Sequence, residues 1–313
     1  MPSVSVIIPT YNNEQTLAQA VQSVFDQTVL PNEIIIVDDG STDGTAAVAK
    51  RLEGSIPVRY TYQANARQAV ARNHGVRLAR SEWLAFLDAD DYWLPGKLKT
   101  QLEALAADAD LRAVIGNYRI QEGRTERTFV PDVVSGGAMT PATLLAANFF
   151  SLPAVLVQKA AYWEIGGIDE QFRNAEDVDF GFRFCKQFKY QFIPEVVTVY
   201  QRRPFSSSQQ EGYDIAGLLQ FYRRVLIRAD LTENERRIAQ EKQRFWRLRQ
   251  RTFLVRRDAV LHGQIAGLHT FFRKVWPKHL SVKALALGVL LLVPGSIRWL
   301  KRHRWQHLDF TVS

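Results

Sequence analysis

Short apolar segments rich in β-branched residues alternate with helical segments through the first part of this 313-residue chain. The segments between the apolar runs carry hydrophobic residues at helical spacing, and helices are predicted at residues 44–52 and 66–79. The apolar runs themselves are predicted strands, at residues 4–8, 33–37, 58–62 and 83–87. This alternation is typical of an α/β domain in which a mostly parallel sheet is flanked by helices.

The pattern becomes less regular after residue 110. Here we expect three strands and one helix, at residues 111–115, 155–158, 191–194 and 176–187. Beyond residue 212 the composition is helical and basic, and Thr232 with Glu235 matches a capping box at the start of a long helix. We therefore divide the chain into an α/β domain, residues 1–212, and a basic helical C-terminal region, residues 213–313.

Polar segments follow the predicted strands: "PTYNNE" after the first, "DDGSTDG" after the second and "DADDYW" after the fourth. Ligands bind at the carboxyl ends of the strands in such sheets. In an extended chain, Asp88 and Asp90 would point to the same side, and two hard oxygen ligands suit Mg²⁺ or Mn²⁺. A solvated acidic turn is the alternative for a lone D-x-D. Asp38 and Asp39, which end a second apolar strand at the same edge, favour a binding site.

Five motifs occur in order along the chain: "VSVIIPTYNNEQTL", "VDDGSTDGT", "ARN-x-G" at residues 71–75, "LDADD" and "GGIDEQF" followed by "EDVDFGFR". Together they resemble the family 2 inverting glycosyltransferases over about residues 3–205. The resemblance implies the GT-A fold, a Rossmann-like sheet that binds nucleotide sugars. One position departs from the family, which often has glycine where this chain has Arg67.

The resemblance also implies roles for individual residues. Asp177 corresponds to the general base, with Glu176 beside it, and Asp91 would be a cap or a partner of a metal ligand. The metal, Mn²⁺ or Mg²⁺, would be bound by Asp90 and Asp88. The residues expected to bind the nucleotide are Thr10, Tyr11, Glu14, Asp39, Arg72 and Asp88, with Asp39 near the base and Arg72 at the base or a phosphate.

Inverting transfer is consistent with these roles. It needs one general base for the acceptor hydroxyl and no protein nucleophile, while the leaving diphosphate gains negative charge that a metal and basic side chains stabilise. Arg202 and Arg203 are candidates for contacts with the diphosphate. For Glu176 and Asp177, the alternative is an acidic first turn of a helix, which favours the helix dipole.

We therefore expect a metal-dependent enzyme that transfers a sugar, preferably from a UDP-sugar, to an acceptor such as a lipid-linked glycan in surface polysaccharide synthesis. The alternatives are a catalytically silent nucleotide-sugar-binding protein and a nucleotide-sugar hydrolase. The sequence contains no G-x-G-x-x-G after a strand, no P-loop motif and no H-E-x-x-H, which disfavours dinucleotide, P-loop and zinc-protease functions. The single cysteine, Cys185, excludes an internal disulfide.

Charge is distributed unevenly along the chain. The net charge is +8, yet residues 220–313 contain 20 basic and 6 acidic side chains. The ten apolar residues 284–293 are too few for a confident membrane span, and the basic and tryptophan-containing segment 298–305 suits a headgroup layer. We expect no secretory signal and a peripheral position on the cytoplasmic face of the inner membrane. The alternative for 284–293 is a helix packed on the domain, and nucleic acid is disfavoured as a partner because no binding module accompanies the charge.

Overall fold

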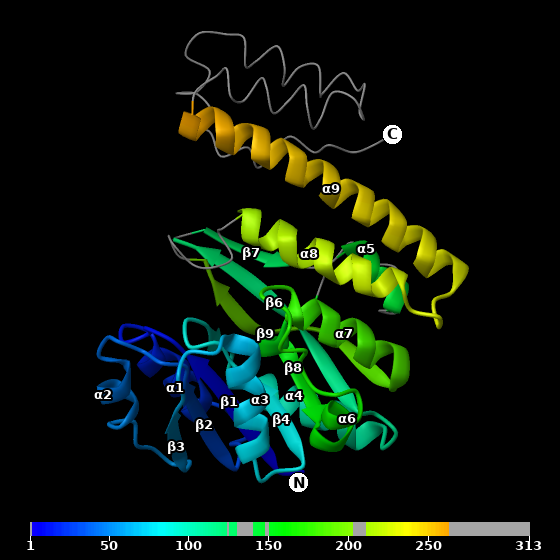
Figure 1. Ribbon diagram of the computed structural model, residues 1–313. Coiled ribbons are helices and arrows are strands. Elements are labelled where there is room, and N and C mark those ends of the chain that lie inside the picture. The colour runs from blue at the N-terminus through cyan, green and yellow to red at the C-terminus, as the bar shows by residue number, and fades with distance from the viewer. Residues whose placement is uncertain (1, 124, 130–139, 148–149, 203–210, 263–313) are drawn as a thin grey trace. The chain divides into compact units, whose positions relative to one another are not determined.

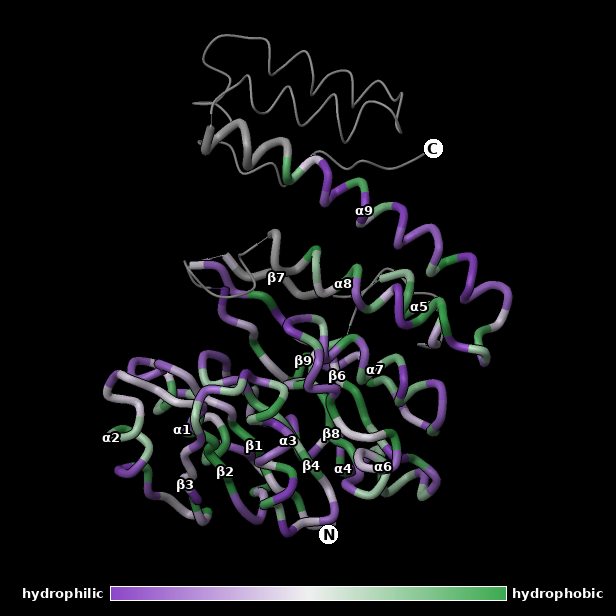
Figure 2. The backbone as a smooth tube through the Cα atoms, in the orientation of Figure 1, coloured by the Kyte–Doolittle hydropathy of each residue, from purple (hydrophilic) through white to green (hydrophobic). Residues whose placement is uncertain are grey.

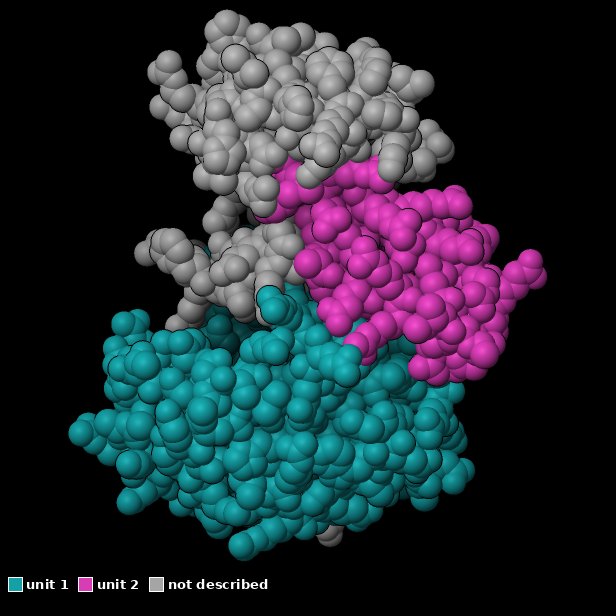
Figure 3. Space-filling view, viewed as in Figure 1, with its two compact units in different colours: residues 1–206 teal, residues 207–313 magenta. Residues whose placement is uncertain are grey.

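The computed structural model describes residues 2–123, 125–129, 140–147, 150–202 and 211–262. The chain separates into two compact units, Met1–Ser206 and Ser207–Ser313 (Figure 3). Sequence analysis predicted a domain boundary at residue 212.

In the described part of unit 1, the strands form one nine-stranded sheet in the order β3-β2-β1-β4-β8-β6-β9-β5, with β7 paired to β6 (Figure 1). The pairs among β3, β2, β1 and β4 are parallel, as is β6 with β9, whereas β8 is antiparallel to both of its neighbours. The strands are β1 Val4–Thr10, β2 Glu33–Asp38, β3 Val58–Tyr62, β4 Trp83–Phe86, β5 Tyr92–Trp93, β6 Ala113–Glu122, β7 Thr125–Phe129, β8 Val155–Gln158 and β9 Tyr190–Gln201.

Helices cover both faces of this sheet. Residues of α1, α2 and α4 join one hydrophobic cluster with β-strand residues such as Val6 and Ile8. Residues of α3, α5, α6 and α7 join a second cluster that includes Ile7, which points to the opposite face. The helices of this unit are α1 Leu17–Phe25, α2 Thr45–Ala49, α3 Gln68–Leu78, α4 Lys97–Ala107, α5 Pro141–Ala147, α6 Lys159–Glu164 and α7 Glu176–Gln187, with a 3₁₀ turn at Leu152–Ala154.

The central strands are buried over their whole length, which explains their continuous apolar runs. Every residue of Val4–Thr10 and Glu33–Asp38 is buried, including the acidic residues at the two ends of β2, Glu33 and Asp38. Strands covered on both faces need hydrophobic side chains at every position, so alternation is lost. Figure 2 shows the result as hydrophobic colouring along β1, β2, β4 and β8.

The strand expected at residues 191–194 is in fact the start of a longer one. β9 passes through Pro194, and its register with β6 shifts between Ile115 and Asn117. The Asn117 side-chain amide donates to the Pro194 carbonyl at 3.4 Å. Proline lacks an N–H and is tolerated in a strand where the ladder is irregular, so Pro194 marks a bulge and not an end.

Unit 2 is described by helices α8 (Glu211–Leu226) and α9 (Glu233–His262). The predicted capping box is confirmed: the backbone N–H of Thr232 donates to Glu235 Oε2 at 2.8 Å, and that of Glu235 donates to Thr232 Oγ1 at 3.2 Å. Within the described ranges, no helix is both long and apolar enough to cross a membrane. The run 284–293 and the segment 298–305 lie outside the described residues.

Candidate active site

The loops that follow β1 and β2 are bonded to each other by side chains. The N–H of Asn12 donates to Ser41 Oγ at 2.9 Å, and Asn12 Oδ1 accepts the N–H of Thr42 at 2.8 Å. Glu14 Oε2 accepts the N–H of Gly44 at 2.7 Å, so this carboxylate holds the "DDGSTDG" turn. The two motifs therefore form one surface at the carboxyl edge of the sheet.

Two of the predicted nucleotide-binding residues lie at the end of β1. Thr10 is buried, while Tyr11 is 50% exposed. Asn13 Oδ1 accepts hydrogen bonds from the Thr10 hydroxyl at 3.2 Å and from the Tyr11 N–H at 3.1 Å, which restrains the Thr10 side chain and the Tyr11 backbone. The Tyr11 ring is therefore presented to a ligand from a rigid backbone. Tyr62, at the end of the edge strand β3 on the other side of β2, is 60% exposed and was not singled out from the sequence.

Asp39 organises the segment that links β3 to α3. Its Oδ1 accepts from Gln63 Nε2 at 2.7 Å and from the N–H of Ala66 at 2.8 Å, and its Oδ2 accepts from the N–H of Arg67 at 2.8 Å. Gln63 Oε1 lies 2.7 Å from Nδ1 of His74 on α3. Gln63 is thus a site residue that sequence analysis missed, because its link to Asp39 comes from the pairing of β2 with β3.

Arg67 adopts an unusual backbone conformation, with φ 79° and ψ 161°. Residues other than glycine rarely occupy this region, which costs of order 1–3 kcal/mol. Close packing also occurs at Gly40, where an added Cβ would lie 2.8 Å from the Asn65 backbone nitrogen. The departure from glycine noted in the sequence therefore introduces strain beside Asp39.

The D-x-D motif forms a turn and not the expected strand end. β4 ends at Phe86, and the N–H of Asp91 donates to the Asp88 carbonyl at 3.0 Å. The prediction that an extended chain aligns Asp88 with Asp90 is therefore wrong. The turn forms because Asp91 is buried, and its Oδ1 accepts the N–H of Gln201 at the end of β9 at 2.8 Å. Asp88 and Asp90 remain partly exposed on either side of buried Ala89.

A metal ion at this turn would rely on few protein ligands. Across the residues that the structure describes, no group of three or more His, Cys, Asp or Glu side chains is placed to hold a metal. Asp88 and Asp90 supply two hard oxygen donors, and a Mg²⁺ or Mn²⁺ ion commonly completes its coordination with substrate phosphates and water. The donor set fits such an ion bound together with a diphosphate.

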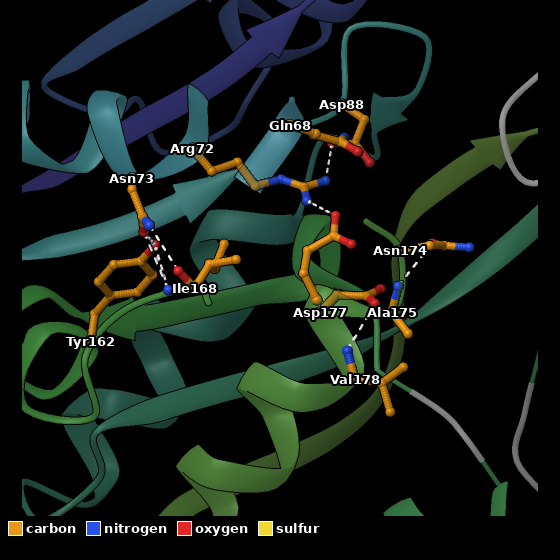
Figure 4. Close-up of polar contacts among 11 residues, drawn as sticks. Gln68, Arg72, Asn73, Asp88, Tyr162, Ile168, Asn174, Ala175, Asp177 and Val178 are labelled. Carbon is orange, nitrogen blue, oxygen red and sulfur yellow. Dashed lines mark hydrogen bonds and ion pairs between the residues drawn. The ribbon is translucent and has the colours of Figure 1, made fainter. Parts of the chain in front are cut away.

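Arg72 of α3 lies between two carboxylates (Figure 4). Its Nη2 donates to Asp88 Oδ1 at 2.7 Å and its Nη1 to Glu176 Oε1 at 2.9 Å. Burial disfavours the charged guanidinium, but the carboxylates of Asp88 and Glu176 raise the pKa of Arg72 above its usual value. Gln68, one turn earlier on α3, also donates to Asp88 Oδ1 at 2.9 Å. α3 thus connects the D-x-D turn to the first residue of α7.

Asp177 follows Glu176 in the first turn of α7. Its Oδ1 accepts the N–H of Val178 at 2.8 Å, which orients the carboxylate. Burial and then the neighbouring charge of Glu176 raise the pKa of Asp177 to about 7, although Arg72 opposes this effect. Ala175, just before the helix, has φ 66° and ψ 20°. A carboxyl group with a pKa near 7 is suited to accept a proton at neutral pH.

The charge of Asp177 also affects Tyr118 of β6. Burial and then the Asp177 carboxylate raise the pKa of its hydroxyl above the ordinary value. Arg202 directly follows β9, and its Nη1 lies 3.8 Å from Glu122 Oε2. Arg203, the other diphosphate candidate, lies outside the described residues.

The overall fold matches solved glycosyltransferases. The S. aureus TarS 1–349 structure in complex with UDP-GlcNAc superposes with a TM-score of 0.66 at 19% identity, covering 96% of this chain and 87% of TarS 1–349. The mannosyltransferase PcManGT from Pyrobaculum calidifontis, in complex with GDP-Man and Mn²⁺, superposes with a TM-score of 0.64 at 19% identity, covering 96% and 83% of the two chains. The α/β sheet flanked by helices is therefore the GT-A fold.

The sequence comparison identifies the family. The model of Glycosyl transferase family 2 matches residues 5–166, and the chain belongs to this family. Validoxylamine A glucosyltransferase from Streptomyces hygroscopicus subsp. limoneus is 30% identical over 216 residues, which cover 58% of this chain and 48% of that protein. An uncharacterized glycosyltransferase from Haemophilus influenzae is 28% identical over 178 residues, covering 56% and 60%. The chain thus spans less than two thirds of the length of these relatives.

Proposed function

We propose that this glycosyltransferase is a metal-dependent inverting enzyme that transfers a sugar from a nucleotide-diphosphate donor to an acceptor hydroxyl. The observation that carries the proposal is the continuous line of charged groups from Asp88 through Arg72 to Glu176, with Asp177 next to it. It places a candidate donor-binding turn and a candidate base on either side of one buried cation. A donor at the D-x-D turn would then have its sugar near a group able to accept a proton.

In the proposed reaction, Asp177 takes the proton from the acceptor hydroxyl as the hydroxyl oxygen bonds to the anomeric carbon. The bond from that carbon to the diphosphate breaks on the opposite face, and the nucleoside diphosphate leaves with the bonding electrons. Asp88 and Asp90 would hold a Mn²⁺ or Mg²⁺ ion, whose positive charge stabilises the leaving diphosphate. Arg202 and Arg203 would add positive charge beside it.

On the donor side, Thr10, Tyr11, Glu14 and Asp39 would surround the nucleoside. The rigid backbone of Tyr11 supports stacking of its exposed ring on a base. We favour a UDP-sugar because TarS binds UDP-GlcNAc, while the GDP-Man complex of PcManGT makes guanosine donors the second choice. The acceptor would be a lipid-linked glycan at the cytoplasmic face of the inner membrane, in surface polysaccharide synthesis, since the basic C-terminal composition suits an anionic surface.

A thermal-shift screen of UDP- and GDP-sugars, with and without Mn²⁺, tests the donor assignment. A ligand at 100 times its dissociation constant adds about 2.7 kcal/mol to the free energy of unfolding. The selected donor is then incubated with and without glycan acceptors while nucleotide release is measured. Release that needs an acceptor supports transfer, release into water alone supports a hydrolase, and binding without release supports a silent binding protein.

We expect Asp90→Ala to abolish Mn²⁺-dependent binding of UDP, because the diphosphate would then face carboxylates without a bridging cation. Calorimetric titration of UDP in the presence of Mn²⁺ measures the effect. Unchanged UDP affinity in this variant would reject the metal assignment.

We expect Asp177→Asn to keep donor affinity and to lower turnover by about 10² to 10⁴, the range for loss of a positioned base. The measurements are donor affinity by calorimetry and turnover by nucleotide release. If affinity fell together with turnover, Asp177 would be a binding residue and the base would lie elsewhere.

A further inference from the structure

The loop between α6 and α7 opens with two glycines in the left-handed region, Gly166 at φ 84° and Gly167 at φ 67°. Their surroundings differ. A Cβ on Gly166 would meet nothing within 4 Å, whereas one on Gly167 would lie 2.9 Å from the Trp163 ring and 3.0 Å from Asn73 Oδ1. The chain therefore packs closely against α3 at Gly167. We call the segment 165–170 the anchored loop.

Asn73 of α3 holds the anchored loop with both ends of its buried amide. Its Nδ2 donates to the Ile168 carbonyl and to Glu170 Oε1, each at 2.8 Å. Its Oδ1 accepts the Tyr162 hydroxyl at 2.5 Å and the Ile168 N–H at 3.2 Å. These four bonds match the full donor and acceptor capacity of an asparagine side chain. Figure 4 shows Asn73 directed toward Ile168, while Arg72 points toward Asp88.

Arg183 of α7 holds the same loop from the other side. Its Nη1 donates to the Ile165 carbonyl at 2.7 Å and its Nη2 to the Gly167 carbonyl at 2.9 Å. Its Nε donates to Asp179 on α7 at 2.7 Å. All three guanidinium nitrogens therefore have acceptors, and the planar fork of arginine joins α7 to the loop in one geometry.

These contacts complete a closed set of three connections. Asn73 joins α3 to the anchored loop, Arg183 joins the loop to α7, and Arg72 joins α7 back to α3 through Glu176. We propose that Asn73 and Arg183 are positioning residues for the general base, which fix Asp177 relative to the D-x-D turn by clamping the anchored loop between α3 and α7. This proposal rests on the assignment of Asp177 as the base.

The reason for such a clamp lies in the reaction geometry. A base and an acceptor must meet within about 3–3.5 Å, and a displacement of about 1 Å can lower a rate by about 10². Asp177 stands in the first turn of α7, where the first backbone N–H groups lack helical partners, so side-chain contacts must contribute to holding this turn in place. Contacts on both sides of that turn, from Glu176 to Arg72 and from Arg183 to the loop, restrict the displacement.

Hydrogen–deuterium exchange tests the mechanical part of the proposal without any substrate. In Asn73→Ala, we expect faster exchange in the anchored loop and also at residues 176–179, although Asn73 contacts only the loop in this region. Helix α1, Leu17–Phe25, is the internal control and is expected to keep its exchange rates. Faster exchange confined to residues 165–170 would overturn the proposal.

Kinetics test the catalytic part through Arg183, which is less buried than Asn73 and therefore the safer site to alter. We expect Arg183→Ala to keep UDP affinity in the presence of Mn²⁺ and to lower turnover by about 10- to 100-fold. Arg183→Lys recovers only part of this loss, because an ammonium lacks the planar fork. The matched control is Gln187→Ala, one turn further on α7, which removes an exposed bond to Glu164 and is expected to keep turnover.

A double-mutant comparison distinguishes positioning from general stability. If Arg183 acts through Asp177, Arg183→Ala has no further effect on the residual turnover of Asp177→Asn. An equal loss of turnover in both backgrounds overturns the proposal. Should the unaltered protein turn over no nucleotide sugar, the proposed function fails, and the exchange experiment alone decides whether the clamp holds α7.

Discussion

At the residue scale, Arg72 has close protein partners that its motif did not indicate. Its predicted contact with a base or a phosphate stays a prediction, and the structure places its guanidinium between Asp88 and Glu176. The partner Glu176 is 104 residues away along the chain, so no local pattern could indicate the contact. Arg72 contacts the D-x-D turn through Asp88 and the residue before Asp177 through Glu176. That these residues form one catalytic site stays a prediction.

The raised pKa of Asp177 predicts a pH profile. As the proposed base, Asp177 would accept a proton only in its ionised form, so kcat/KM is expected to rise with pH through about 7. The charge of Glu176 contributes to this raised pKa, so Glu176→Gln is expected to shift the acidic limb to lower pH. Initial rates between pH 5 and 9 locate the acidic limb of the unaltered enzyme and that of the Glu176→Gln variant. An acidic limb that stays in place in Glu176→Gln would assign the titration to another group.

At the element scale, strands β1 to β4 and the antiparallel strand β8 could be predicted from the sequence, whereas β5, β7 and the full length of β6 and β9 could not. β1 and β2 were recognised because they are short, continuous apolar runs, and β3 because it is rich in β-branched and aromatic residues. The long pair β6 and β9 was shortened in the prediction, since its outer part is only partly buried and its register contains a bulge at Asn117. The D-x-D turn was missed because Asp91 contacts Gln201, 110 residues away.

The two glycines of the anchored loop give a paired test of this element. Both Gly166→Ala and Gly167→Ala place a side chain at positive φ, which costs about 1 kcal/mol. Only Gly167→Ala also forces a Cβ against Trp163 and Asn73, so we expect a larger loss in the free energy of unfolding. Urea denaturation of the two variants gives the difference. Equal losses in the free energy of unfolding would show that the loop can shift to accommodate the Cβ at residue 167 without a further cost in stability.

Helix α4 begins with a fully buried lysine. Lys97 Nζ donates to Gln101 Oε1 at 2.6 Å and lies 4.8 Å from the centre of the Trp93 ring. Burial lowers the pKa of Lys97 well below the ordinary value of a lysine side chain. Between the lowered pKa of the folded state and the usual value near 10, the unfolded chain binds more protons than the folded protein, so stability is expected to rise with pH across that range.

Lys97→Met removes this titration, so its stability is expected to rise less between pH 7 and 10 than that of the unaltered protein. Urea denaturation at several pH values measures both slopes. Parallel slopes would mean that Lys97 stays protonated in its buried position.

At the scale of the whole molecule, charge separates a candidate catalytic unit from a basic one. α9 contains arginines through most of its length, and its exposed ones include Arg237, Arg244 and Arg247. Figure 2 shows this helix mostly in hydrophilic colours. The sequence alone could predict this difference in charge, because net charge depends on the number of charged residues in each part of the chain and not on how they pack.

Replacing Leu290, Leu291 and Leu292 with Ser tests the proposed membrane association. These changes remove apolar burial in lipid, while the basic residues still contribute about 1 kcal/mol each near an anionic surface. We expect weaker binding to anionic vesicles with greater salt sensitivity, and unchanged donor affinity. Flotation with phosphatidylserine vesicles at several salt concentrations measures the effect. Precipitation of the variant, with no vesicle binding by the parent, would identify the segment as core.

The pairing of β5 with β9 also bears on how the protein is made. The loops after β1 and β2 contact one another within the first 50 residues, so they can form early in synthesis. The D-x-D turn obtains its strand partner only when Thr198, Val199 and Gln201 have been added. At about 5–20 residues per second, that delay is on the order of 10 s. A nascent chain would thus have the loops after β1 and β2 in place well before the D-x-D turn, the candidate metal site, has its strand partner.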